Sequence, residues 1–302
     1  MKKRTRRSRK STRTNKPIVL DSFTQQQMQL WDSQGHTLQK LSDRVYFELE
    51  RQRVDHYDAL CSSLRAAPST TVDVTDWARV TDWRWNLTPL SAAGSLNGIG
   101  GRFNIGNDLD RARNQAFKCL YIAENVDTAF GEYFGGSLSA IKGGLSLSEL
   151  ALRRASSFTT FLLRGRIEQV MDLRTDEALH AFADIIKSFN ISAETKEAAL
   201  RAGLPPRAMM GSAMELWRQL LAPPSEWRLE PQAFGIPAAC QLFGRFVQDA
   251  GLEGILFPSQ HGDGSCLAVY PVNFRASDGH IEVIGAVPEG ATHTMLDRDH
   301  FL

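Results

Sequence analysis

The 302-residue sequence predicts an α+β fold built on a mixed sheet, with a helical segment ahead of it. Three observations predict this class. The hydrophobic content of 42% is enough to bury a substantial core. Short β-prone runs alternate irregularly with segments whose apolar residues recur every three or four positions, as they do in amphipathic helices. No regular βαβ period appears, which argues against a doubly wound parallel sheet.

Residues 1–19 are predicted to form a disordered basic tail, because they hold nine Lys or Arg and no acid and have little to bury. Residues 20–71 are predicted to be a helical extension of two helices, with a break at Gly35 and a linker over residues 66–71. The main domain is predicted over residues 72–290. Without the tail, the chain carries more acids than bases.

Within the main domain, strands and helices are predicted from the same two periodicities. Strand-like runs rich in β-branched or aromatic residues lie at 83–85, 119–123, 158–163, 170–173, 254–257 and 267–272. Helical patterns lie at 126–140, 176–190, 194–203, 207–221 and 237–250. The last of these is expected to end at Gly251, since a left-handed glycine commonly ends a helix.

Cysteine and histidine spacing indicates neither a disulfide framework nor a metal site. Cys61, Cys119, Cys240 and Cys266 form no CxxC pair, and the last three lie in apolar surroundings that indicate burial. The seven histidines show no paired ligand spacing such as HExxH. No apolar run is long enough to cross a membrane and no secretory signal appears, so a soluble, cytoplasmic protein is expected.

Four polar residues that lie beside glycine-rich backbone or near strand ends are candidates for one site: Arg102, Tyr121, Glu132 and Ser259. The loop before Arg102 is expected to have positive φ at Gly98, Gly100 and Gly101, and such loops let backbone approach a phosphate closely. Each candidate also has an ordinary structural explanation, as a turn, a core tyrosine, a solvated carboxylate or a loop serine.

A serine hydrolase triad of Ser259, His261 and Asp263 is disfavoured. Groups two residues apart in one loop rarely reach the geometry in which the base hydrogen-bonds the nucleophile. The sequence has no GxSxG elbow. It also lacks a GxGxxG segment that opens a helix and a GxxxxGK[ST] loop, so the common nucleotide-binding motifs are absent.

In chain order these segments resemble the RES domain family, toxins of bacterial toxin–antitoxin pairs that are named for an Arg, a Glu and a Ser. The resemblance covers about residues 80–273 and rests on the segments 100–104, 120–124, 128–132, 170–173 and 251–259. It implies that Arg102, Glu132 and Ser259 are the naming triplet and that Tyr121 accompanies them. It also implies a sheet core similar to the ADP-ribosyltransferase fold, with NAD as substrate and no further cofactor.

By the same resemblance, the chain is expected to cleave the nicotinamide–ribose bond of NAD, with water or phosphate as acceptor, and to have a separate antitoxin protein as partner. Glu132 would stabilise positive charge on the ribose and Arg102 would pair with pyrophosphate or a carboxylate. Tyr121 would contact the nicotinamide, and Ser259 would orient Arg102 or the ribose.

Two alternatives remain open. One is a protein ADP-ribosyltransferase, since nothing in the sequence identifies the acceptor. The other belongs to a different class, a non-enzymatic nucleic-acid-binding protein that uses the basic tail. The acidic body and the lack of a nucleic-acid-binding motif disfavour it.

Overall fold

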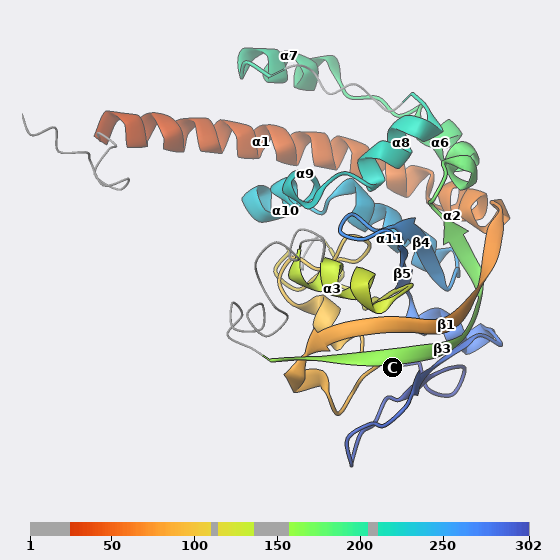
Figure 1. The fold of residues 1–302 in the computed structure, drawn as a ribbon. Coiled ribbons are helices and arrows are strands. Elements are labelled where there is room, and N and C mark those ends of the chain that lie inside the picture. Colours follow the sequence, from red (N-terminus) through yellow and green to blue (C-terminus); the bar gives the residue numbers. More distant parts are fainter. Residues whose placement is uncertain (1–24, 110–113, 136–156, 205–210, 302) are drawn as a thin grey trace, which may run out of the picture.

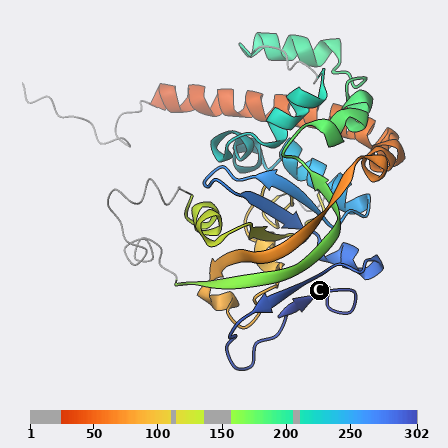
Figure 2. The ribbon, with the colours of Figure 1, turned by 45° about the vertical axis from the view of Figure 1, so that its right-hand side comes forward.

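The computed structural model describes residues 25–109, 114–135, 157–204 and 211–301. In these residues a seven-stranded mixed sheet has the order β1-β2-β5-β4-β3-β6-β7 (Figures 1 and 2). The strands are β1 (Ser69–Asp82), β2 (Leu120–Ala123), β3 (Phe158–Asp172), β4 (Gly254–Pro258), β5 (Ser265–Val269), β6 (His280–Ile284) and β7 (Met295–Leu296). The predicted combination of helices with a mixed sheet is confirmed.

Five of the strands pair in a closed circuit. The long strands β1 and β3 pair with each other, while β1 also pairs with β2 and β3 with β4, and β5 joins β2 to β4. The β3–β4 pairing is parallel and the others are antiparallel. The registers place Ala78, Ala123, Cys266 and Phe257 in one row across β1, β2, β5 and β4.

Two helices precede the sheet, as predicted, but they meet at His56 and not at Gly35. Helix α1 spans Gln25–Asp55 and α2 spans Tyr57–Ala66. Gly35 lies inside α1 on an exposed turn, where glycine costs only about 1 kcal/mol relative to alanine and does not by itself end a helix. The predicted linker is wrong from Ser69 onward, because β1 begins there.

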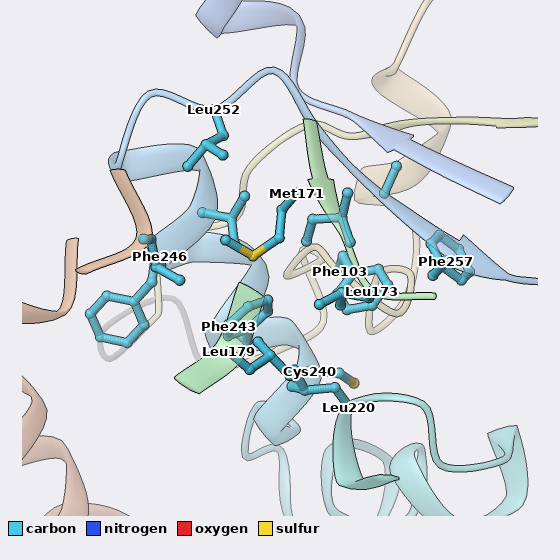
Figure 3. Close-up of a cluster of buried hydrophobic side chains, with 14 of the residues drawn as sticks. Phe103, Met171, Leu173, Leu179, Leu220, Cys240, Phe243, Phe246, Leu252 and Phe257 are labelled. Carbon is cyan, nitrogen blue, oxygen red and sulfur yellow. The ribbon is translucent and has the colours of Figure 1, made fainter. Parts of the chain in front are cut away.

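Helix α2 packs into the same core as the sheet. Its residues Leu60, Cys61 and Leu64 are buried in one cluster with residues of α6 (His180–Ile186), α8 (Ala213–Leu220) and α11 (Ala239–Asp249). Figure 3 labels Phe243 and Phe246 of α11 together with Met171 and Leu173 as members of this cluster. The boundary between residues 71 and 72 stays a prediction, but the segments on its two sides share this core.

The remaining helices are short and lie on or near these elements. They are α3 (Val126–Phe134), α7 (Ala193–Arg201), α9 (Pro224–Trp227) and α10 (Leu229–Phe234). Helix α7 contacts α1 and lies on its outer side (Figure 1). In the described residues, no helix is both long and apolar enough to cross a bilayer.

Several predicted boundaries need correction. Residues 83–85 form a 3-10 turn after β1, not a strand. The two strands predicted between 158 and 173 are one strand, β3. Strand β5 ends at Val269, because Pro271 starts a 3-10 segment. The left-handed Gly251 after α11 is confirmed, with φ of 86°.

Other predictions concern residues that the structure does not describe. The basic tail and the start of the first predicted helix lie in residues 1–24. The end of the helix predicted at 126–140 and the start of that predicted at 207–221 lie in residues 136–156 and 205–210. Helices α9 and α10 and strands β1, β6 and β7 were not predicted as such from the sequence.

Candidate functional site

A cavity of about 610 Å³ opens over the row of strand residues Ala78, Ala123, Cys266 and Phe257. Its other walls come from the glycine-rich loop, helix α3 and helix α9. Three of the four predicted site residues line it, namely Arg102, Tyr121 and Glu132. Its volume is within the range of small-molecule sites, so these distant residues converge on a space that could hold a ligand.

The guanidinium of Arg102 is held by backbone at the end of α8. Nη1 donates to the carbonyl oxygens of Leu220 at 3.0 Å and Ala222 at 2.7 Å. Burial lowers the pKa of Arg102, and the nearby Glu132 carboxylate opposes this by favouring the charged form. Carbonyl groups at a helix C-terminus carry partial negative charge, so they stabilise the buried cation and leave it charged. Arg102 therefore contributes a fixed positive charge to the cavity wall.

Tyr121 connects β2 to the loop that carries Arg102. Its hydroxyl accepts a hydrogen bond from the backbone N–H of Phe103 at 2.9 Å and donates to Asn104 Oδ1 at 3.0 Å. Burial raises the pKa of Tyr121 well above its ordinary value. Since the neutral hydroxyl already serves two protein partners, the ring, and not the hydroxyl, is the part of Tyr121 best placed to contact a ligand.

The glycine-rich loop is shaped by close approach to its neighbours. The predicted positive φ is confirmed at Gly98 and Gly100, whereas Gly101 does not have it. A Cβ at Gly101 would lie 2.5 Å from the Tyr121 hydroxyl oxygen, so glycine is required there for space. The buried amide of Gln241 on α11 donates to three carbonyl groups of the loop region. These contacts fix the backbone on both sides of Arg102.

Helix α3 positions Glu132 at the cavity. The helix starts at Asn125, whose side chain accepts from the backbone N–H of Thr128 at 2.8 Å, and it ends at the left-handed Gly135. A Cβ at Gly131 would lie 2.5 Å from the carbonyl oxygen of His261, so the helix lies directly on the loop after β4. Glu132 is exposed, as expected for a carboxylate on this helix, but it faces the cavity and that loop.

Ser259 contacts Glu132 and not Arg102. Glu132 Oε1 accepts from Ser259 Oγ at 2.6 Å and from the Gln260 backbone N–H at 3.0 Å. The Gln260 side chain donates to the Ala222 carbonyl oxygen, which also accepts from Arg102. Ser259 lies in an adjoining hollow of about 340 Å³ that Arg102 also lines. The loop therefore fixes one carboxylate oxygen of Glu132. It also donates to the same backbone carbonyl group, that of Ala222, to which Arg102 donates.

The serine hydrolase hypothesis gains nothing from this loop. Ser259 Oγ accepts from the backbone N–H of His261 at 3.0 Å, and its own proton goes to Glu132. A triad needs the imidazole to take the hydroxyl proton. The arrangement instead uses the serine to orient a carboxylate.

Two further arginines among the residues that line the cavity were not predicted from the sequence. Arg79 lines it with backbone, because it follows Ala78 on β1 and its side chain lies on the opposite face of the strand, the face of its partner Phe161. Arg79 of β1 is buried and donates to the carbonyl oxygens of Pro89 at 2.7 Å and Ser91 at 2.9 Å, and burial lowers its pKa to about 10. Arg228 follows α9 and is exposed. An arginine within the apolar, β-prone run around Arg79 was a detectable signal, since such a residue needs buried partners. For Arg228, the only sequence feature that could have indicated a site residue is the neighbouring tryptophan.

The lining of the cavity is positively charged. Among the described residues whose side chains can face it, Arg102 and Arg228 are cationic and Glu132 is the carboxylate. Arginine pairs well with phosphate oxygens, so the site fits an anionic ligand. Within the described ranges, no three His, Cys, Asp or Glu side chains gather as a metal site would require.

This fold and site define an α+β protein with an electropositive ligand cavity. The model of the RES domain family matches residues 76–291, more than two-thirds of the chain, and the protein belongs to that family. The resemblance identified from the sequence motifs is thus confirmed.

One solved structure with a similar chain is that of the M. tuberculosis MbcT–MbcA toxin–antitoxin complex. The similarity has a TM-score of 0.42 and 15% sequence identity, and it covers 75% of this chain and 90% of that chain. None of the curated proteins matches the sequence.

Proposed function

We propose that this RES domain protein cleaves the nicotinamide–ribose bond of NAD, with water or inorganic phosphate as the acceptor. The observation that carries the proposal is the placement of one exposed carboxylate, Glu132, in a cavity whose other charged side chains are Arg102 and Arg228. NAD has the matching pattern, because its pyrophosphate is anionic and its nicotinamide ribose becomes cationic as the bond breaks. Membership in the RES family supports the same reaction class.

In this reaction the bond between the ribose anomeric carbon and the pyridinium nitrogen breaks, and its electron pair stays on the nitrogen. Neutral nicotinamide leaves, so no acid is needed to protonate the leaving group. The ribose acquires oxocarbenium character, as in glycoside cleavage. An oxygen of water or phosphate then supplies the electron pair of the new bond, and an attacking water releases one proton to solvent. Water would yield ADP-ribose, and phosphate would yield its 1-phosphate.

Glu132 has the role of stabilising the ribose cation. One of its oxygens is occupied by Ser259 and Gln260, which leaves the other to face the ribose carbon or a ribose hydroxyl. A carboxylate held by donors does not have to reorganise as charge develops, and this is the chief source of electrostatic catalysis. Arg102 would pair with the pyrophosphate, and the ring of Tyr121 would contact the nicotinamide.

The proposal also includes the biological setting that the family resemblance implied. The protein would act as a toxin that depletes NAD in the cytoplasm, and a separate antitoxin would block it. The closed strand circuit would then be a variant of the ADP-ribosyltransferase fold. Growth arrest on expression of the wild type, but not of a Glu132→Gln variant, would agree with this setting.

The direct test follows nicotinamide release from NAD by the purified protein, with and without phosphate. Glu132→Gln should lower turnover about 100- to 1000-fold, since it removes the charge that stabilises the transition state. Glu197→Gln, at an exposed position on α7 that does not line the cavity, should match the wild type. If NAD labelled in its ADP-ribose part leaves the label bound to protein, and not in free ADP-ribose, the enzyme is a protein ADP-ribosyltransferase. Equal turnover by wild type and a folded Glu132→Gln variant would refute the role of Glu132.

A further inference from the structure

A second cavity of about 610 Å³ adjoins the first. It is lined mainly by the glycine-rich loop, by Asp108 and by residues around α10. Arg228 lines both cavities, and the loop contributes Gly100 to the second and Gly101 to the first. The two spaces therefore meet at Arg228 and at this pair of glycines.

At this junction two guanidinium groups lie near one tryptophan ring. The Cζ atom of Arg102 is 5.8 Å from the centroid of the Trp227 ring, and that of Arg228 is 5.1 Å from it. Burial lowers the pKa of Arg102, and the positive charge of Arg228 lowers it further. The two like charges therefore repel each other, and an anion shared between them would relieve the repulsion. The indole N–H of Trp227 is also buried without a hydrogen-bond partner.

The lining of the second cavity suits a nucleoside. Asn97, Asp108 and Gln232 are exposed side chains on its wall. A carboxylate such as Asp108 can accept hydrogen bonds from both hydroxyl groups of a ribose, as acidic residues do in dinucleotide-binding folds. Asn97 and Gln232 offer amide donors and acceptors of the kind that read the edge of a base. These residues are polar but not basic, so this cavity is less suited to a second phosphate group.

We infer that the second cavity binds the adenosine half of NAD, and that Arg228 and Arg102 hold the pyrophosphate at the junction between the two cavities. This inference rests on the proposed function, since it assigns the parts of the same substrate. It makes Arg228 a substrate-binding residue for dinucleotides. Nicotinamide mononucleotide lacks the adenosine half and the second phosphate. The inference therefore predicts that cleavage of this mononucleotide depends much less on Arg228 than cleavage of NAD does.

The experiment compares NAD with nicotinamide mononucleotide as substrates for the wild type, Arg228→Ala and the control Arg201→Ala. Arg201 is exposed on α7 and lines neither cavity. In Arg228→Ala, the KM for NAD should rise about 10- to 100-fold, as expected when a charge-assisted contact is lost. The kcat/KM for the mononucleotide should change by less than about threefold. Arg201→Ala should match the wild type with both substrates.

An unchanged KM for NAD in Arg228→Ala would overturn the inference, and so would an equal loss with both substrates. Binding of ADP-ribose, measured by calorimetry, provides a test that does not need turnover. Its affinity should fall about 10- to 100-fold in Arg228→Ala and more than twofold in Asp108→Asn. If the wild type releases no nicotinamide, the proposed reaction fails; the cavity assignment then stands or falls on these affinities alone.

Discussion

Replacing Tyr121 by Phe tests whether its hydroxyl holds the site loop together. The substitution removes one oxygen that accepts from Phe103 N–H at 2.9 Å and donates to Asn104 Oδ1 at 3.0 Å. Phe103 and Asn104 are fully buried, so water cannot replace the lost acceptor without rearrangement. An unsatisfied buried donor costs about 1–3 kcal/mol. Because 1 kcal/mol shifts Tm by roughly 2–4 °C in domains of this size class, Tm should fall by roughly 2–12 °C.

The assay is thermal unfolding followed by circular dichroism, with Tyr57→Phe as the matched control. Tyr57 loses the same atom, but its hydroxyl donates to Asp249 on an exposed part of the surface, at 2.6 Å. Water can take over that bond, so the control should lose no more than about 1 kcal/mol. If Tyr121→Phe unfolds at the same temperature as Tyr57→Phe, the hydroxyl does not support the loop and the argument fails. The ring remains in Tyr121→Phe, so nicotinamide release should fall by less than about tenfold.

Three other predictions concern the site, the core and the outer helix. Ser259→Ala should lower kcat for nicotinamide release about tenfold, because Glu132 loses its 2.6 Å hydrogen bond; an unchanged kcat would rule out this positioning. Leu64→Ala should lower the free energy of unfolding by about 2–5 kcal/mol in a single transition, since Leu64 is fully buried in the shared core; a separate early transition would show that α2 folds independently. Burial tends to raise the pKa of Glu48, but hydrogen bonds from Thr195 of α7 and from its N-cap residue Ser192 hold it below its ordinary value of 4.5. This carboxylate therefore stabilises α7 above that pH and loses the effect as pH falls below it. Hydrogen–deuterium exchange of α7 should therefore accelerate in Glu48→Gln at neutral pH, and equal protection in the two proteins would contradict the assignment.

The sequence predicted best those elements whose apolar pattern matches one face of a helix or strand. Helix α11 is an example, since Cys240, Phe243, Phe246 and Val247 recur at helical spacing and are all buried. Strand β2 was also predicted, because a short apolar run is typical of a strand buried between neighbours. Strand β1 was not predicted, since register shifts interrupt the alternation of its buried residues. Its pairing with β3 compensates for that irregularity.

The failure at Gly35 has a similar cause. A glycine weakens a helix by an amount that neighbouring turns can offset, so the break depends on the total stability of the segment and not on one residue. At residues 83–85, the alternating Trp-Arg-Trp sequence favoured a strand. The chain instead turns there after β1, and Asp82 accepts a hydrogen bond from Tyr133 of α3. That contact joins segments 51 residues apart, so it cannot be predicted from the local sequence.

The sequence by itself determined three features of this protein: the residue types of the site, their order along the chain and the family to which the protein belongs. Arg102, Tyr121 and Glu132 were expected to share a site, and they line one cavity. Tertiary structure decided which groups meet. It paired Ser259 with Glu132, bound the Tyr121 hydroxyl to the loop and brought Arg228 to the same cavity. Hydrogen bonds and charge pairs act over a few ångströms, so they depend on how distant segments pack, whereas helix and strand patterns depend on neighbours along the chain.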